Sequence, residues 1–299
     1  MGTTGWATEN GDDLTVTVAQ WYRQHGRDLP WRREGFTPWG SLVSEIMLQQ
    51  TPVARVLAPL AEWLERWPDA AALAQASVAD VVRAWGRLGY PRRALRLRDA
   101  AITIVEHHGG EVPSNIDDLL ALPGVGDYTA RAIAAFAFGQ RVPVVDTNVR
   151  RVIARAVHGR ADAAPPSTRR DLADAEALLP DAPAEAAEFS AALMELGAII
   201  CTARAPQCDA CPLAHVCRWR LNGYPAHDGP RRAVQAKYEG SDRQVRGLVL
   251  ALLRDAERCV SHAELDQAWA DPEQLRRAID TLASDGLIVR EGDGYRLPE

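Results

Sequence analysis

Four of the five cysteines cluster in the sequence as a C-x6-C-x2-C-x5-C pattern, formed by Cys201, Cys208, Cys211 and Cys217. Four thiolates at this spacing can converge on one centre, and both zinc and iron–sulfur clusters accept four thiolate ligands. Because the N-terminal sequence MGTTGWATENGDD lacks the basic and apolar regions of an export signal, we do not expect disulfides. The spacing alone leaves zinc and iron–sulfur open. Cys259 is distant, and we expect it to be a buried apolar residue.

One glycine-rich turn and one aspartate could also do chemistry. LPGVG (122–126) contains Gly124 and Gly126, separated by one residue, and lies between two segments of helical periodicity. The chain can therefore form a tight hairpin whose N–H groups, at the start of a helix, bind a phosphate, although the same pattern is typical of an ordinary turn. Asp146, in VPVVDTNVRRVIARAV (142–157), precedes a helical stripe and is either an N-cap or a reactive carboxylate. The residues alone leave these alternatives open.

Glu45 lies at the edge of a predicted apolar helix face. Thr37 and Pro38 are a typical cap and first-turn pair at the start of that helix. Partial burial at the edge of the face would favour the protonated form that a general acid needs. An exposed helical glutamate is the alternative. The apolar stripe itself consists of Trp39, Leu42, Val43, Ile46 and Met47.

The elements that must position these residues are helices. Apolar residues recur every three or four positions, and strand patterns are nearly absent before the last sixty residues, so we predict an all-α core. A first helix contains Leu14 and Val18 and is closed by Gly26. The further expected helices cover 53–66, 77–87, 92–108, 115–121, 127–138, 147–157, 167–179 and 185–200.

A small C-terminal module is predicted at 241–299. The segment before it is rich in Gly, Pro and charge, which makes 226–240 a linker. Three helices are expected in the module, at 242–256, 261–269 and 272–284, followed by two short strands within LIVREGDGYRL (287–297). Helices closed by a hairpin indicate a winged-helix-like α+β fold.

The composition limits the classes of function. The 299 residues are 47% hydrophobic and 25% charged, enough for two or three domains, and contain no apolar run of the roughly 20 residues that a membrane span requires. We therefore expect a cytoplasmic protein. The formal charge of −6 argues against bulk attraction to nucleic acid, yet six arginines lie between Arg83 and Arg98. The only lysine is Lys237.

Several motifs together resemble the helix-hairpin-helix DNA glycosylase superfamily and, within it, the MutY-type adenine glycosylases. The resemblance implies a [4Fe–4S] cluster on the four cysteines, and two helical subdomains, 1–30 with 147–225 and 31–146. It also implies a monovalent cation bound by the hairpin carbonyls. The motifs, spread over approximately residues 14–225, are RDLPWR (27–32), SEIMLQQT (44–51), RLGY (87–90, where the family begins with Gly), ALPGVG (121–126), VDTNVRRV (145–152) and the cysteine run.

The same resemblance assigns the chemistry to four residues. Releasing adenine requires protonation of the base and stabilisation of the sugar cation. Glu45 matches the residue that protonates adenine, and Asp146, kept ionised at its helix start, matches the one that stabilises or transiently bonds the sugar carbon. Asn148 matches a residue that positions Asp146 and the water. Strand-cutting relatives have a Schiff-base lysine where this chain has Tyr128, so we expect little or no lyase activity.

The remaining site residues and the partner also follow from the resemblance. The expected partner is double-stranded DNA with adenine mispaired with 8-oxoguanine or guanine, bound by a nucleoid-associated monomer. Gln50 and Tyr90 match wedge residues beside the opposing base. The adenine pocket or its mouth would be lined by Arg27, Trp31, Arg32, Leu48 and Thr51, and a DNA phosphate would be bound by Gly124, Val125 and Gly126, with Arg204 added from the cysteine loop.

Two departures from the family leave alternatives open. Ala191 stands where MutY-type enzymes usually have a base-contacting Gln or Glu, and the small module replaces a longer C-terminal domain that helps to read 8-oxoguanine. One alternative is a thymine or uracil mismatch glycosylase of the same fold, although such enzymes lack the residue that Glu45 matches. The other is a non-catalytic iron–sulfur DNA-binding regulator, which would need neither Glu45 nor Asp146.

Overall fold

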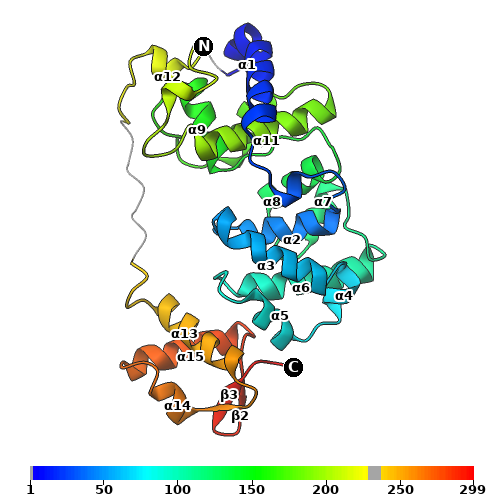
Figure 1. The fold of residues 1–299 in the computed structure, drawn as a ribbon, viewed down its shortest axis with the longest axis vertical. Helices are drawn as coiled ribbons and strands as arrows, with labels where there is room; N and C mark the ends of the chain where they lie inside the picture. The colour runs from blue at the N-terminus through cyan, green and yellow to red at the C-terminus, as the bar shows by residue number, and fades with distance from the viewer. Residues whose placement is uncertain (1–2, 228–236) are drawn as a thin grey trace. The chain divides into compact units, whose positions relative to one another are not determined.

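The computed structural model describes residues 3–227 and 237–299, and the predicted helical core is confirmed (Figure 1). Short 3-10 turns occur at Pro30–Arg32 and Cys208–Ala210. The helices before the C-terminal module are α1 Thr3–His25, α2 Pro38–Leu48, α3 Val53–Arg66, α4 Ala70–Ala74, α5 Val78–Trp85, α6 Arg92–His107, α7 Ile116–Ala121, α8 Asp127–Phe136, α9 Thr147–Ala156, α10 Thr168–Glu176, α11 Pro183–Ile199 and α12 Arg218–Leu221.

Local capping explains where the site-bearing helices begin. The Thr37 hydroxyl accepts a hydrogen bond from the Gly40 amide at 3.0 Å, so α2 starts where the Thr-Pro pair predicted. α5 is capped by Ser77, which accepts from the Asp80 amide at 3.0 Å. Asp146 caps α9 with its carboxylate. The N-cap interpretation of Asp146 is therefore confirmed as its structural role.

The described chain divides into two compact units, which we treat separately. The first unit contains residues 3–41, 114–120 and 126–227, and the second contains 42–113, 121–125 and 237–299. In the first unit α11 packs on α1 and α9. Its core consists of Leu14, Val18, Trp21, Val149, Val152, Ile153, Ala156, Val157, Ala175, Leu178, Leu179, Ala186, Phe189, Ala192, Leu193, Leu196 and Leu213.

The second unit packs α4 and α5 against α6, and α3 against α5. Three tryptophans fill its centre: the rings of Trp63 and Trp67 lie 4.6 Å apart, and those of Trp63 and Trp85 lie 5.5 Å apart, both edge to face. Such pairs bury large apolar areas in a fixed geometry. Trp85, the last residue of α5, is thereby packed into this cluster, and the loop that matches the wedge motif follows it directly.

The C-terminal module has the predicted winged-helix-like organisation, with one strand more than expected. Its elements are α13 Asp242–Asp255, β1 Val260–Ser261, α14 His262–Asp266, α15 Pro272–Ser284, β2 Val289–Glu291 and β3 Gly294–Arg296. The strands form an antiparallel sheet in the order β1-β3-β2, with Val260 opposite Tyr295 and Val289 opposite Arg296.

Three sequence predictions need correction. The helix expected at 261–269 covers only His262–Asp266: Ser261 ends a strand and forms a capping box with Glu264, and after Asp266 the chain turns, with the Ala268 amide donating to the Leu265 carbonyl at 3.0 Å. The strand β1 and the five-residue α4 were not predicted, since neither is long enough to show a periodic pattern. Of the predicted linker 226–240, residues 228–236 lie outside the described residues. The predicted subdomain boundaries stay a prediction.

Among the described residues no helix is both long and apolar enough to cross a membrane. The predicted apolar stripes are confirmed in the structure. Ile46 and Met47 of α2 are fully buried, as are nearly all side chains of the α9 stripe from Val149 to Val157. The two predicted carboxylates therefore stand on helices that are anchored in their own units.

Candidate active site

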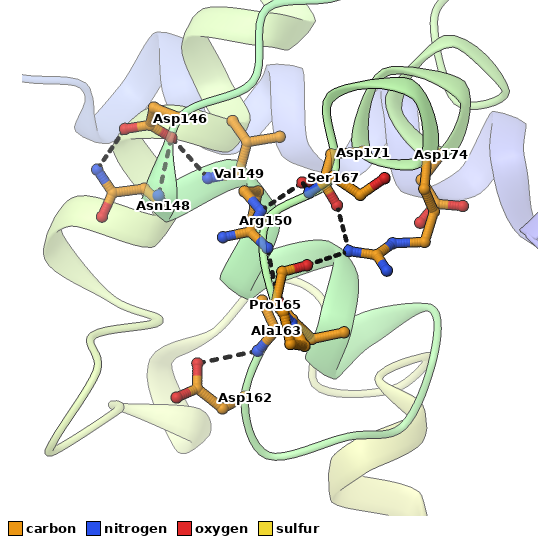
Figure 2. Close-up of polar contacts among 12 residues, drawn as sticks. Asp146, Asn148, Val149, Arg150, Asp162, Ala163, Pro165, Ser167, Asp171 and Asp174 are labelled. Carbon is orange, nitrogen blue, oxygen red and sulfur yellow. Dashed lines mark hydrogen bonds and ion pairs between the residues drawn. The ribbon is translucent and has the colours of Figure 1, made fainter. Parts of the chain in front are cut away.

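Asp146 presents its carboxylate to three donors at the start of α9 (Figure 2). Oδ1 accepts from the amides of Asn148 at 2.8 Å and Val149 at 2.7 Å, and Oδ2 accepts from the Asn148 side-chain amide at 2.7 Å. Burial raises the pKa of Asp146, while these hydrogen bonds and the more distant Arg151 oppose the rise. The group is thus a largely desolvated carboxylate held by neutral donors, and such a group can act as an electrostatic stabiliser or a nucleophile.

Asn148 is fixed by a second layer of contacts. Its side-chain oxygen accepts from Arg151 Nη2 at 2.7 Å, and the same arginine donates to the carbonyls of Gly197 and Cys201, both at 2.6 Å. A Cβ on Gly197 would lie 2.6 Å from the Asn148 Cβ, so only glycine allows α11 to approach α9 here. The predicted residues Asp146 and Asn148 are therefore in contact, and Arg151 and Gly197 support them.

Glu45 and Leu48 are half-buried on α2, in the second unit. The carboxylate predicted to act as an acid and Asp146 thus belong to different units. Tyr128 lies in the first unit, half-buried against the small core of Ala132, Ala135 and Val144. Tyr128 stands on α8 immediately after the hairpin, as the sequence predicted.

Gln50 and Tyr90, the two predicted wedge residues, share an unusual backbone conformation. Their φ angles are +56° and +48°, and among the described non-glycine residues only Tyr224 also has a positive φ. Both side chains are exposed, Tyr90 to 43%. A left-handed backbone is costly for residues that carry a Cβ, so surrounding contacts must hold these two positions.

Arg93 supplies those contacts from the start of α6. Its side chain is only 8% exposed, and within the described chain its six hydrogen bonds all go to neutral oxygens. It donates to the Gln49 carbonyl at 2.6 Å and to the Gly89 carbonyl at 2.9 Å, which joins the turn after α2 to the loop before α6. Its remaining acceptors are the carbonyls of Ile46, Met47 and Leu88 and the Thr51 hydroxyl.

Gly86–Tyr90, which we call the wedge loop, has every carbonyl oxygen hydrogen-bonded. Burial lowers the pKa of Arg93 to about 10, yet its cation is retained at neutral pH and also lies over the Trp85 ring at 5.1 Å. The loop is thus held by donors from several elements. The donors are Arg254 to Gly86, Arg55 to Arg87, Arg93 and Thr51 to Leu88, Trp85 and Arg93 to Gly89, and the Arg93 amide to Tyr90.

The hairpin joins α7 to α8. Gly124 has a φ of +82°, a Cβ there would lie 3.0 Å from the Arg96 Cβ, and its carbonyl accepts from Gln49 at 3.2 Å. Val125 is buried and its amide closes the turn on the Leu122 carbonyl at 3.1 Å. Gly126 caps α8 in an extended conformation, with open space where a side chain would stand. This geometry suits a main-chain phosphate site.

Arg27 and Arg32 converge on one buried carboxylate that the sequence prediction missed. Glu195 on α11 has a fully buried side chain, and accepts from Arg27 Nε at 2.6 Å and from Arg32 Nη2 at 2.8 Å. Burial opposes its ionisation, but the two guanidiniums outweigh this effect and hold the pKa of Glu195 at about 2. Trp31, between them, is half-buried. Both arginines are therefore positioned by α11.

The four cysteines line one cavity. Burial raises the pKa of Cys211 to about 12 and also raises that of Cys217, and the neighbouring thiols add to both rises. Four partly buried thiols in one cavity can all be ionised only around a cationic centre. The residues present therefore fit a metal cluster with four thiolate ligands, which when bound supplies a cross-link between the ends of the loop.

Arg155 provides a buried positive charge beside this cavity. It is 5% exposed, lies 3.4 Å from Cys201 Sγ, and donates to the carbonyls of Thr202 and Ala203 at 2.7 and 3.2 Å. Its guanidinium lies 4.7 Å from the Trp219 ring centre. Arg155 thus orders the first part of the cysteine loop and offsets thiolate charge. Arg204, expected to face DNA, is exposed.

The residues that sequence reasoning missed had a detectable signal. Arg93 occupies the apolar stripe of α6 with Leu97, Ala100 and Ile104, all fully buried. Glu195 stands among the buried residues of α11, and Arg155 within the stripe of α9. A charged residue within the apolar stripe of a helix is buried, and burial is tolerated only when the charge is hydrogen-bonded or paired. Such residues are therefore candidates for positioning roles.

Comparison with known proteins decides the family. Residues 43–175 match the HhH-GPD superfamily base excision DNA repair proteins, and residues 201–217 match the iron–sulfur binding domain of endonuclease III. The adenine DNA glycosylase of Mycobacterium tuberculosis (strain ATCC 25618 / H37Rv) is 60% identical over 285 residues, which cover 95% of this chain and 93% of that protein. The chain belongs to the adenine DNA glycosylase family of the HhH-GPD superfamily. Its four cysteines hold a [4Fe–4S] cluster, as the resemblance predicted.

Other members of the superfamily share the glycosylase part. Human adenine DNA glycosylase is 42% identical over 68% of this chain, a match that covers 39% of the human protein. The solved structure of a thermostable thymine-DNA glycosylase has a TM-score of 0.65 at 27% identity, covering 72% of this chain and 99% of that one. A solved complex of endonuclease III with DNA, at 23% identity and a TM-score of 0.60, shows the same fold. The superfamily fold is confirmed, and DNA is the partner.

Proposed function

We propose that this glycosylase hydrolyses the N-glycosidic bond of adenine mispaired with 8-oxoguanine or guanine in double-stranded DNA. The observation that carries the proposal is the 60% identity to a mycobacterial adenine DNA glycosylase over 95% of the chain, a span that includes both carboxylate motifs. The half-buried carboxylate of Asp146, which three neutral amide donors hold in place, supports it. We further propose that the enzyme acts as a nucleoid-associated monomer in the cytoplasm.

The two carboxylates divide the reaction between them. Glu45 protonates the adenine ring, which turns a poor leaving group into a good one. Asp146 remains ionised and stabilises the cationic sugar carbon, while Asn148 holds Asp146 and the attacking water. Two carboxylates in unlike environments performing acid and electrostatic roles is the general pattern of glycoside hydrolysis. The released products are adenine and an abasic site.

Strand cleavage is not part of the proposed reaction. A lyase needs an amine to form an imine with the sugar, and Tyr128 stands at the position where strand-cutting relatives have lysine. The only lysine of the chain, Lys237, follows the segment 228–236 and is exposed. We therefore expect a glycosylase with little or no lyase activity.

Pocket and phosphate contacts complete the proposal. Arg27, Trp31, Arg32, Leu48 and Thr51 line the adenine pocket or its mouth. Gln50 and Tyr90 insert beside the opposing base and offset the few kcal/mol of stacking lost when adenine leaves the helix. The phosphate contacts are made by Gly124, Val125, Gly126 and Arg204, and a monovalent cation binds the hairpin carbonyls.

Activity on thymine or uracil opposite guanine is the second candidate. A thymine/uracil-DNA glycosylase of Pyrobaculum aerophilum is 38% identical over 66% of this chain and 87% of its own length. Glu45 favours adenine, because releasing a pyrimidine opposite guanine does not require an acid directed at the adenine ring. The choice between the two substrates can be measured directly.

Single-turnover assays test the proposal on four duplexes, with A opposite 8-oxoguanine, A opposite G, T opposite G and U opposite G. We expect base release only from the two adenine duplexes, and strand breaks only after alkali. Asp146→Asn and Glu45→Gln should each abolish release, whereas Glu62→Gln, on an exposed face of α3, should not change it. Thymine or uracil release, or full activity of Asp146→Asn, would refute the proposal, and nicking before alkali would refute the absence of lyase activity.

A further inference from the structure

The C-terminal module shares its hydrophobic core with the glycosylase part of the second unit. Ala79 and Val82 of α5 belong to the same buried cluster as Val249 and Leu282 of the module. The Ala79 amide donates to the Pro298 carbonyl at 2.8 Å. Separate domains joined only by a linker do not normally share buried side chains and main-chain hydrogen bonds. The module is therefore a built-in part of the second unit.

The module contacts the wedge loop on both flanks. Arg254, at the end of α13, donates to the Gly86 carbonyl at the first residue of the loop. Two residues beyond Tyr90, Arg92 pairs with Asp285 at 3.4 Å, and Asp285 also accepts from Arg246 at 2.6 Å. Leu95, one turn further along α6, packs against the module core. The module therefore contacts the loop region both at the end of α5 and at the start of α6.

The surface charge of the module does not suit recognition of DNA. Asp and Glu outnumber Arg and Lys within residues 237–299. On α15, the helix that a winged helix would lay in the major groove, Arg276 lies 3.7 Å from Asp280 and Arg277 lies 3.8 Å from Asp242. The acidic residue beside each arginine lowers the positive potential that a DNA backbone would meet at this helix.

We propose that the C-terminal module is a brace for the wedge loop, and that Arg254 is the positioning residue through which it holds Tyr90 for reading the base opposite adenine. The inference rests on the proposed function, which makes Tyr90 a wedge residue. It gives the module a part in reading the opposing base without direct contact with DNA. Arg254 acts through main-chain geometry: Gly86 has a φ of +55°, and the orientation of its peptide sets the direction of the loop.

The brace is tested first without DNA, by hydrogen exchange in the complete holoenzyme. Arg254→Ala should accelerate amide exchange in residues 86–90 on the order of tenfold, because one charge-assisted hydrogen bond is lost. Exchange in α9 should not change. The matched control is Arg258→Ala, which breaks an exposed ion pair with Glu264 elsewhere in the module and should leave residues 86–90 as protected as before. Unchanged protection at 86–90 in Arg254→Ala would overturn the brace.

A double-mutant cycle then tests whether Arg254 works through Tyr90. Arg254→Ala should slow single-turnover adenine release opposite 8-oxoguanine about tenfold in the wild-type background and less than about twofold in the Tyr90→Ala background. Arg254→Lys, which keeps one charged donor, should recover most of the rate. Equal losses in both backgrounds would assign Arg254 to general stability and refute the proposal.

The two ways of failing are distinguishable. If the wild-type protein released no adenine while Arg254→Ala still loosened residues 86–90, the proposed function would be wrong and the structural brace would stand. If adenine were released normally but the cycle were additive, the function would stand and the inference would fall.

Discussion

Two carboxylates of the first unit, the half-buried Asp146 on α9 and the fully buried Glu195 on α11, have opposite electrostatics. Two guanidiniums hold the pKa of Glu195 at about 2. Asp146 instead accepts hydrogen bonds from three neutral amide groups, and burial raises its pKa. A charge paired with charges is locked in its ionised form and serves as a structural anchor. A charge whose direct hydrogen-bond donors are all neutral stays more reactive, which suits the role proposed for Asp146.

Arg93 in the second unit resembles Asp146, because it is a charged group whose hydrogen-bond partners are neutral, but its charge is positive. It is a cation whose hydrogen bonds go to neutral oxygens, and its pKa is lowered to about 10. Because a guanidinium ionises so readily, this shift leaves it charged at neutral pH. The same kind of environment that makes Asp146 reactive therefore makes Arg93 a permanent organiser of the backbone around Gln50 and Tyr90.

Replacing Arg93 should have the largest effect on stability. Arg93→Met removes the cation and leaves several buried carbonyls without donors, so we expect the free energy of unfolding to fall by about 3–5 kcal/mol. Urea denaturation followed by the fluorescence of the nine tryptophans, which include the buried Trp63 and Trp85, measures the loss. Arg93→Lys keeps the charge but has fewer donors, so its free energy of unfolding should lie between those of wild type and Arg93→Met. A loss below about 1 kcal/mol would mean that the carbonyls find other donors.

Glu195→Gln should have the next largest effect. The variant keeps the shape but leaves Arg27 and Arg32 without their anion, and because Arg27 is 39% exposed we expect a smaller loss of about 2 kcal/mol at pH 7. The pKa of Glu195 is depressed, so its contribution is present above the unfolded value of about 4.3 and is lost as the pH falls towards 2.

A surface pair on the same helix provides the control for Glu195. Arg23, 59% exposed, binds Glu188 at 2.5 Å. Arg23→Gln should not measurably change denaturation at any pH, because water screens the pair. The free energies of unfolding of Glu195→Gln and of wild type should also converge as the solution is acidified below about pH 4. A constant difference between them down to pH 3 would contradict the charge-pair explanation.

Asn148→Ala tests whether neutral donors control the pKa of Asp146. The variant removes one donor to the charged form of Asp146, so the pKa of Asp146 should rise further and the acid limb of adenine release should move to higher pH by about one unit. The pH profile of single-turnover release measures this shift. Asn115→Ala, which removes the caps of α7 instead, should leave the limb in place. An unshifted limb in Asn148→Ala would show that Asp146 does not control it.

The comparison also separates what the sequence could predict from what it could not. Asp146 and its helix were predictable because an N-cap and the stripe that follows lie within a few residues of each other. The partners of Arg93 lie 44 residues away at Gln49 and four away at Gly89, and those of Glu195 lie 163 and 168 residues away. Such contacts arise from packing, which periodicity does not encode.

The same reason explains the module. Its helices and hairpin follow local patterns and were predicted, but the hydrogen bond from Arg254 to Gly86 joins residues 168 apart, and the shared core with Ala79 depends on tertiary packing. From the sequence alone the module was an appendage with no assigned role. Structure was needed to show that it belongs to the unit that carries the wedge loop.

Asp146→Asn gives the smallest expected change in stability and the sharpest contrast with Glu195→Gln. Asparagine caps a helix as well as aspartate does, although its amide nitrogen cannot accept from the Asn148 side chain as Oδ2 does. The substitution also removes a charge whose pKa is raised by burial, and such a charge destabilises the fold at pH values above the pKa of Asp in the unfolded chain. We expect the variant to be as stable as wild type or more stable by up to about 1 kcal/mol at pH 7, with the gain shrinking as the pH falls towards 4. Denaturation at pH 7 and pH 4 measures both. Glu195→Gln would then lower stability, whereas Asp146→Asn would lower only activity. An equal loss of stability in the two variants would contradict the distinction between Glu195 as a structural anchor and Asp146 as a reactive group.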